Sequence, residues 1–200
     1  MKVRELGIPD AYEISTDVFP DERGLFVNPY RAEVLEEVIG HPLRLEQTNH
    51  SVSRRGVVRG VHFALVPPGQ AKYVYVPRGC ALDIVVDIRL GSPTYLQHDV
   101  VRLDDRELSA VYLAEGLGHC MVALEDDTVM SYLCSTGYAP DREKGISPAD
   151  PALALPLPSD PKPLLSPRDT AAPTVAEAVE QGLLPTYAEC RAFYASLRRP

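Results

Sequence analysis

Polar side chains interrupt segments of this sequence that otherwise resemble apolar β-strands, and their types suit proton-transfer chemistry. They are Arg59 and His62 within residues 56–65, Lys72 at the start of the next such segment, His119 after a glycine-rich stretch, and Tyr132 within residues 128–134. Imidazole and phenol groups exchange protons, and cations stabilise a developing anion. Because unpaired buried polar groups are costly, such a row favours a site inside the fold. Taken singly, each residue fits ordinary packing or a surface charge.

The segments that must position these residues are short and β-like. Between Leu25 and about Leu133, turn residues separate runs at 25–31, 56–65, 72–76, 81–90, 109–114 and 128–134. No long helical pattern interrupts this region, which disfavours βαβ units and a parallel sheet. Many closely spaced strands predict a mainly β fold, an antiparallel sandwich or jelly-roll barrel.

Helical patterns flank this region. Residues 32–40 form one candidate helix, ended by Gly40. After a proline-rich connector at 152–169, expected to be extended, a capping-box signature at Thr174 and Glu177 begins a second helix. A third follows Pro185. We therefore predict one domain over residues 1–200, with a barrel core at about 20–150 and a short C-terminal helical extension at about 174–198.

Composition limits the classes of function. The formal net charge is -8, which disfavours binding to nucleic acid or to an anionic membrane surface. No apolar run approaches the roughly 20 residues of a membrane span. The N-terminus lacks a signal-peptide pattern, so a cytoplasmic location is expected.

Several cofactor motifs are missing from the sequence. Neither a dinucleotide-binding GxGxxG after a strand nor a phosphate-binding GxxxxGK[ST] is present. The HxH pair of metal-binding cupins is absent, since Phe63 and Ala64 follow His62. The cysteines form no CxxC pair and are expected to be buried thiols; they are Cys80, Cys120, Cys134 and Cys190. We therefore predict neither a cofactor nor a metal.

Together, the motifs match a known family. They are RGxHF at 59–63, QxKxV at 70–74, VDIRxGSPT at 86–94 and SYxxSxxY at 131–138. In this combination and order the chain resembles the dTDP-4-dehydrorhamnose 3,5-epimerase family and its relatives in antibiotic deoxysugar pathways. It looks most similar to 5-epimerases of glycopeptide antibiotic pathways. The resemblance implies a cupin-like jelly roll that acts without a cofactor on a dTDP-linked 4-keto-6-deoxyhexose.

The resemblance also implies catalytic roles. Removal of a proton from C3 or C5, next to the ketone, gives an enolate, and a proton returned to the other face inverts the carbon. His62 matches the base, and Asp169 matches the carboxylate that pairs with it. Tyr132 matches the opposing acid, and Lys72 matches the cation near the enolate oxygen.

Substrate-binding residues carry over in the same way. They are Arg23 and Arg59 for the pyrophosphate, Gln47 and Asn49 for the nucleotide and sugar, Phe26 and Tyr138 for stacking, Glu143 for thymidine, His119 for the sugar, Asn28 where Glu is usual, and Arg168 where Lys is common. The resemblance further implies a homodimer in which the N-terminal segment around Arg23 and Phe26 completes the neighbour's site.

Some questions stay open at this point. Asn28 and Cys120 depart from the family pattern and could restrict inversion to one carbon, with C5 favoured. Alternation along a strand puts Arg59 and His62 on opposite faces, unless Gly60 hosts a bulge or the substrate wraps the barrel mouth. Two other functions remain: a metal-dependent cupin isomerase or dioxygenase, and an inactive dTDP-sugar-binding jelly roll.

Overall fold

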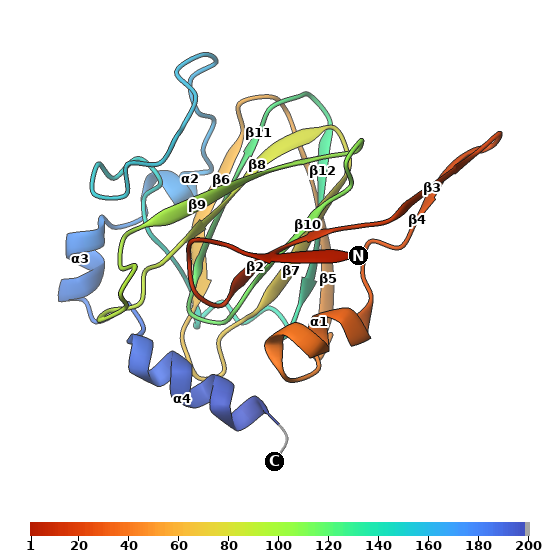
Figure 1. Ribbon diagram of the computed structural model, residues 1–200. Helices are drawn as coiled ribbons and strands as arrows, with labels where there is room; N and C mark the ends of the chain where they lie inside the picture. Colours follow the sequence, from red (N-terminus) through yellow and green to blue (C-terminus); the bar gives the residue numbers. More distant parts are fainter. Residues whose placement is uncertain (199–200) are drawn as a thin grey trace.

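Two antiparallel β-sheets face each other in the computed structural model, which describes residues 1–198 (Figure 1). The six-stranded sheet contains, in spatial order, β1 (Lys2–Glu5), β2 (Ala11–Ser15), β10 (Ala110–Leu113), β7 (Lys72–Arg78), β12 (Thr128–Cys134) and β5 (Gln47–Ser53). The five-stranded sheet contains β13 (Glu143–Gly145), β6 (Val58–Ala64), β11 (Gly118–Ala123), β8 (Cys80–Val86) and β9 (His98–Asp104). This mainly antiparallel architecture is the predicted cupin-like jelly roll.

A separate hairpin projects from this body. Its strands are β3 (Val18–Asp21) and β4 (Gly24–Val27), which pair with each other and reach away from both sheets (Figure 1). The predicted β-like run at 25–31 therefore contributes a strand only as far as Val27. The six-stranded sheet already includes β1 and β2, before residue 20. The division into barrel core and helical extension stays a prediction, and residues 199–200 of the predicted domain lie outside the described residues.

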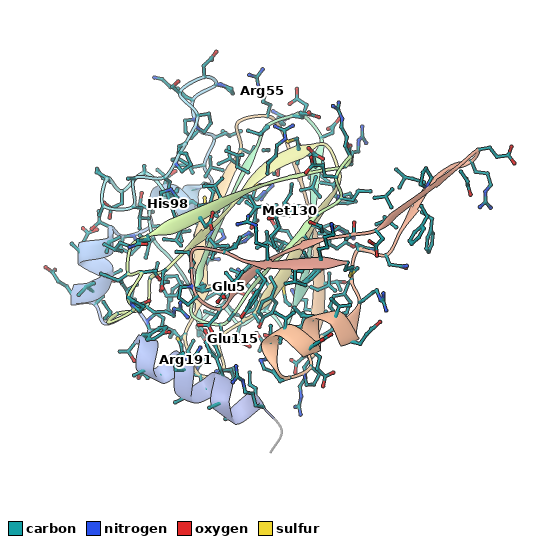
Figure 2. All side chains as sticks on the ribbon, in the orientation of Figure 1. Glu5, Arg55, His98, Glu115, Met130 and Arg191 are labelled. Atoms are coloured by element: carbon teal, nitrogen blue, oxygen red, sulfur yellow. The ribbon has the colours of Figure 1, made fainter. Side chains whose placement is uncertain are left out.

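Alternating residues along β8 enter two different apolar clusters. Ile84 and Val86 pack with residues of β6 and β11 and with the C-terminal segment, on one face of the five-stranded sheet. Val85 packs on the other face, in the cluster that also contains Met121 and Met130. Met130 lies deep between the sheets in Figure 2. Successive residues of β8 therefore face opposite sides of the sheet, and the sheet has an inward face able to carry a site.

Three helices form where the sequence predicts them. Helix α1 (Ala32–Ile39) ends at Gly40, which has a φ of 80° and donates its N–H to Glu36 O. Helix α3 (Val175–Glu180) has the predicted capping box of Thr174 and Glu177. Helix α4 (Tyr187–Leu197) begins with a second capping box, formed by Thr186 and Glu189. Within residues 1–198, no helix is long and apolar enough to cross a membrane.

The proline-rich connector was expected to be extended throughout, and its end differs from that expectation. Helix α2 (Pro167–Thr170) forms a single turn there. Ser166 caps it, because its side chain accepts a hydrogen bond from the Asp169 N–H. Pro167 occupies the first turn, where its missing N–H costs nothing. This turn fixes the direction in which Asp169 points.

Arg89, within the VDIRxGSPT motif, makes buried ion pairs in the barrel and also contacts α4. The Arg89 side chain is fully buried and donates two hydrogen bonds to the Asp87 carboxylate, at 2.9 Å each. A third goes to Asp10 Oδ2 at 2.8 Å. The guanidinium also lies 4.9 Å from the ring centroid of Tyr187 on α4. The motif therefore has a structural role, tying the N-terminal loop, the end of β8 and α4 together.

Candidate active site

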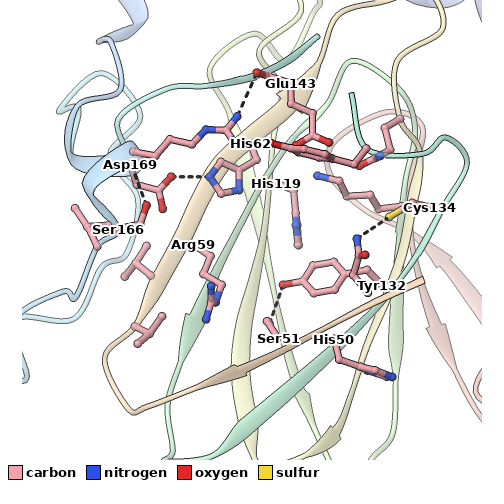
Figure 3. Close-up of a pocket in the computed structure, with 18 of the residues that line it drawn as sticks. His50, Ser51, Arg59, His62, His119, Tyr132, Cys134, Glu143, Ser166 and Asp169 are labelled. Carbon is pink, nitrogen blue, oxygen red and sulfur yellow. Dashed lines mark hydrogen bonds and ion pairs between the residues drawn. The ribbon is translucent and has the colours of Figure 1, made fainter. Parts of the chain in front are cut away.

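A cavity of about 550 Å³ opens between the sheets, and polar side chains from many parts of the chain line it (Figure 3). Every residue predicted to be catalytic lies on its wall, namely His62, Lys72, Tyr132 and Asp169. Most predicted binding residues also line it, namely Gln47, Asn49, Arg59, His119, Tyr138, Glu143 and Arg168. Within residues 1–198, no group of three or more His, Cys, Asp or Glu side chains is placed to hold a metal ion.

His62 and Asp169 form a short hydrogen-bonded pair across 107 positions of sequence. His62 Nε2 lies 2.6 Å from Asp169 Oδ1. The Asp169 side chain is 5% exposed, whereas that of His62 is 34% exposed and open to the cavity. Burial alone raises the pKa of Asp169, but the hydrogen bond and charge of His62 outweigh it and hold that pKa below its usual value. The carboxylate therefore orients the imidazole and leaves its Nδ1 for another partner.

A β-bulge in β6 brings Arg59 and His62 to the same face. His62 is opposite His119 and Arg59 is opposite Met121, so Gly60 and Val61 together are opposite Cys120. Gly60 has a φ of 142°, in a region that is essentially restricted to glycine. The bulge is thus the answer to the alternation problem that the sequence left open.

Tyr132 faces His62 from the opposite sheet. It lies on β12 of the six-stranded sheet, whereas His62 lies on β6 of the five-stranded sheet. Its hydroxyl oxygen is 3.2 Å from Ser51 Oγ, and its ring meets that of His119 edge to face, with centroids 5.9 Å apart. Burial raises the pKa of Tyr132 to about 12. A neutral phenol and an imidazole therefore stand on opposite walls of one cavity.

Lys72 adds a cation to this wall from the start of β7. Burial lowers the pKa of Lys72, while the neighbouring Cys134, Glu143 and Asp83 act in the opposite direction. Its ammonium group is therefore easier to deprotonate than one in water. A partly desolvated cation interacts strongly with any anion formed beside it.

The inward face of edge strand β5 forms a series of hydrogen bonds that hold site residues. Gln47 donates to Asn49 Oδ1 at 2.7 Å and accepts from the Tyr138 N–H at 2.7 Å. Ser51 contacts Tyr132, and Ser53 accepts a hydrogen bond from Arg59 Nε at 3.1 Å. Sequence reasoning found Gln47 and Asn49 but missed the two serines. Their polar side chains at alternate positions of one strand were the available signal.

Asp83 is a third residue that sequence reasoning did not place in the site. Its Oδ1 lies 2.6 Å from His119 Nε2, and both side chains are buried. Within residues 1–198, Asp83 Oδ2 has no hydrogen-bond partner. A charged residue between the apolar residues Leu82 and Ile84 was the signal. Asp83 does not line the cavity, so it reaches the site through His119.

Three predicted binding residues lie outside this cavity, namely Arg23, Phe26 and Asn28. The β3–β4 hairpin and the segment after it carry them. Phe26 is 62% exposed, and its ring centroid is 6.5 Å from that of the exposed Phe19. Arg23 pairs with Asp21 on the same hairpin. A single chain therefore does not bring these residues to its own cavity.

Comparison with protein families gives one match that covers most of the chain. The model of the dTDP-4-dehydrorhamnose 3,5-epimerase family matches residues 5–177. The chain is 50% identical, over 100% of its length and 98% of the relative, to the dTDP-4-dehydrorhamnose 3,5-epimerase of Mycolicibacterium smegmatis. It is 52% identical, over 96% of its length and 92% of the relative, to the dTDP-4-dehydrorhamnose 3-epimerase of Streptomyces niveus.

Solved structures are also closely similar. NovW, a 4-keto-6-deoxy sugar epimerase from the novobiocin biosynthetic gene cluster of Streptomyces spheroides, superposes with a TM-score of 0.93 and 52% identity, covering 95% of both chains. ChmJ, a 3'-monoepimerase from Streptomyces bikiniensis in complex with dTDP-quinovose, superposes with a TM-score of 0.95 and 43% identity, covering 98% of both chains. The relatives therefore include enzymes named for inversion at C3 alone and at both C3 and C5.

Proposed function

This chain belongs to the dTDP-4-dehydrorhamnose 3,5-epimerase family, and from that premise we propose that it inverts C3, C5 or both of a dTDP-linked 4-keto-6-deoxyhexose. The observation that carries the proposal is the placement of His62, held by Asp169, opposite Tyr132 in one cavity. The reaction would serve deoxysugar biosynthesis of the antibiotic or rhamnose type. The preference for C5 inferred from the sequence stays a prediction, since the relatives' names do not favour it.

The proposed chemistry begins at His62. Its Nδ1 takes the proton from a carbon beside the ketone, and the electron pair of the broken C–H bond moves onto the ketone oxygen as an enolate. Lys72 stabilises the negative charge on that oxygen. Loss of one comparable hydrogen-bond donor costs about 10²- to 10³-fold in rate. Tyr132 then delivers its phenolic proton to the opposite face. The substrate loses one proton and gains one with no change of oxidation level, so no hydride carrier is needed; exchange with water then removes the proton from His62 and returns one to Tyr132.

The proposed nucleotide site surrounds this centre. Arg59 and Arg168 supply cations for the pyrophosphate and the adjoining sugar, which the chain's net charge of -8 makes necessary. Tyr138 is 60% exposed at the rim and offers a ring for thymine to stack on. Arg168 Nη2 donates to the Glu143 carbonyl oxygen at 3.2 Å, which holds these two residues together beside the opening.

We further propose that the active form is a homodimer. Arg23, Phe26 and Asn28 cannot serve their own cavity from the projecting hairpin, which exposes two phenylalanine rings. Burying those rings against a second copy would stabilise association. The same contact would bring the cation and the ring to the neighbour's nucleotide site.

The deciding experiment is proton NMR of dTDP-4-keto-6-deoxyglucose incubated with the protein in deuterated water, followed at C3 and C5 separately. We expect deuterium to enter at one or both carbons, and His62→Ala to abolish this exchange. Exchange at the uncatalysed rate with dTDP binding intact would instead identify an inactive dTDP-sugar-binding protein. Activity that a chelator abolishes and a transition metal restores would identify a metal-dependent cupin.

A further inference from the structure

One hydrogen bond of the cavity has no role in the chemistry described so far. Tyr132 Oη and Ser51 Oγ lie 3.2 Å apart, and either oxygen could be the donor. Within residues 1–198, Ser51 is the one hydrogen-bond partner of the Tyr132 hydroxyl. Figure 3 shows the tyrosine ring directed at Ser51, which lies on edge strand β5 and lines the cavity.

The direction of this hydrogen bond is decided by what Tyr132 must do. A phenol has a single hydrogen, and a phenol that donates to Ser51 cannot also point that hydrogen at a substrate carbon. Delivery of the proton to carbon therefore requires Ser51 to be the donor and Tyr132 Oη the acceptor. In that arrangement the serine hydroxyl aligns the phenolic hydrogen with the substrate.

The surroundings of Tyr132 make such a donor necessary. Once the proton has gone, the ring carries a phenolate in a buried place that disfavours it. The Asp83 carboxylate on β8 opposes the new charge, whereas Arg59 on β6 favours it and is already bonded to Ser53. His119 on β11 meets the ring edge to face, and Cys134 lies on the same strand as Tyr132. Ser51 is the group already in contact with the oxygen that becomes charged.

We propose that Ser51 is a positioning residue for the acid step of the epimerisation. It donates its hydrogen bond to Tyr132 Oη, frees the phenolic hydrogen for the enolate carbon and stabilises the phenolate that remains. The phenolic O–H bond breaks as the new C–H bond forms with the enolate electron pair. The phenolate then takes the serine proton, the serine oxygen takes one from water, and the hydroxide so formed takes the proton that His62 removed, which restores all three groups. This inference rests on the proposed function.

Once the enolate has formed, the carbon can regain a hydrogen on either face, and the test measures the two rates separately. In deuterated water, a deuteron returned by His62 enters with retention of configuration, whereas delivery of a proton or deuteron by Tyr132 inverts the carbon. NMR of the substrate and product measures both rates at each carbon. In Ser51→Ala we expect inversion to fall about 10- to 100-fold, the usual effect of losing a hydrogen bond to a charged group. Exchange with retention should continue. A residue with a purely structural role would lower both rates together.

A matched control lies on the same face of the same strand. Ser53→Ala removes a hydroxyl that holds Arg59 rather than Tyr132. We expect it to raise KM and to leave the ratio of exchange to inversion unchanged. Ser51→Thr keeps the hydroxyl and should keep the wild-type ratio. If Ser51→Ala does not fold, Ser51→Cys, which keeps a weak donor, should show the same change of ratio to a smaller extent.

The outcomes separate this inference from the proposed function. A folded Ser51→Ala or Ser51→Cys variant with the wild-type ratio overturns the inference while the epimerase function stands. An equal change of ratio in Ser53→Ala also overturns it, because the effect would then belong to the whole strand. Absence of exchange in the wild-type protein with every keto-sugar overturns the proposed function itself.

Discussion

Gly60 lies directly against Cys120. A Cβ atom on Gly60 would stand 2.6 Å from both the Cys120 Cα and the His119 carbonyl oxygen, closer than real side chains approach. The backbones of β6 and β11 therefore meet at the bulge as closely as glycine permits. This contact turns Arg59 and His62 to the same face of the sheet.

Gly60→Ala should destabilise the fold and nearly abolish activity. Strain at this positive φ and overpacking against Cys120 each cost about 1–3 kcal/mol. Urea unfolding and the rate of epimerisation measure the two effects. Gly91→Ala is the control, because Gly91 also has a positive φ but nothing within 4 Å of its built Cβ. An equal loss of stability in both variants would show that the contact with Cys120 is unimportant.

Asp169→Asn should lower kcat by about 10²- to 10⁴-fold with little change in KM, because the amide no longer holds His62 in its productive tautomer. The carboxylate has a lowered pKa, so its pairing stabilises the fold above the usual Asp range near 4 and is lost as the pH falls through the lowered value. Steady-state kinetics test the first statement. Asp160→Asn, an exposed change in the same connector, should behave as wild type.

The sequence predicted the barrel where its strands are apolar and missed strands that are polar. Within residues 81–90, Ile84 and Val86 pack into one apolar cluster and Val85 into the other, so this strand has an apolar pattern to detect. Strand β5, with the sequence QTNHSVS, lies at a sheet edge and turns its polar side chains into the cavity. Its stability comes from pairing with β12 rather than from burial of its own side chains. Such a strand has no apolar pattern to detect.

The sequence predicted the residues of the candidate site that lie in motifs, but not the contacts that strand pairing creates. The motifs identified His62, Lys72, Tyr132 and Asp169, and the structure brings them to one cavity. The local sequence could not show that Ser51 contacts Tyr132, since they lie 81 positions apart and meet through strand register. The sequence left open whether Gly60 hosts a bulge or the substrate wraps the barrel mouth. The register of β6 against β11 shows the bulge.

Glu115 should make stability depend on pH. Burial raises the pKa of Glu115 from 4.5 to about 7. Because the folded state holds this proton more tightly, the contribution of Glu115 to stability is greatest below about pH 4.5 and falls by about 3 kcal/mol as the pH rises to 7 and slightly beyond. Urea unfolding at pH 5 and pH 8 should show this slope in wild type and not in Glu115→Gln. Figure 2 places Glu115 at the end of the barrel beside α4, where Tyr194 donates to its carbonyl oxygen.

Arg89→Met should cost about 3–5 kcal/mol, because it leaves the buried Asp87 carboxylate without its cation. It should also loosen α4, which stacks Tyr187 on that guanidinium. Chemical denaturation gives the free energy, and amide hydrogen exchange in α4 reports the loosening. Arg102→Met is the control, since the Arg102 side chain is 59% exposed and solvent screens its ion pair with Asp104. Comparable losses in the two variants would contradict this account.

Mixing two inactive variants should restore activity if the hairpin serves the neighbouring subunit. In a one-to-one mixture of Arg23→Ala and His62→Ala that exchanges subunits, half of the dimers are mixed and each has one intact site, giving about a quarter of wild-type activity. Mixing Lys72→Ala with His62→Ala should restore none, because both residues line the cavity of their own chain. Failure of the first mixture, with subunit exchange verified, would place Arg23 outside the neighbour's site.

The separation of His62 and Asp169 has a consequence for protein synthesis. The ribosome releases β6 early, whereas α2 emerges 107 positions after His62, when most of the barrel has left the exit tunnel. A growing chain therefore exposes an imidazole without its carboxylate for most of translation. The imidazole is paired only after α2 has docked, so a chain truncated before Asp169 should form most of the barrel without a paired His62.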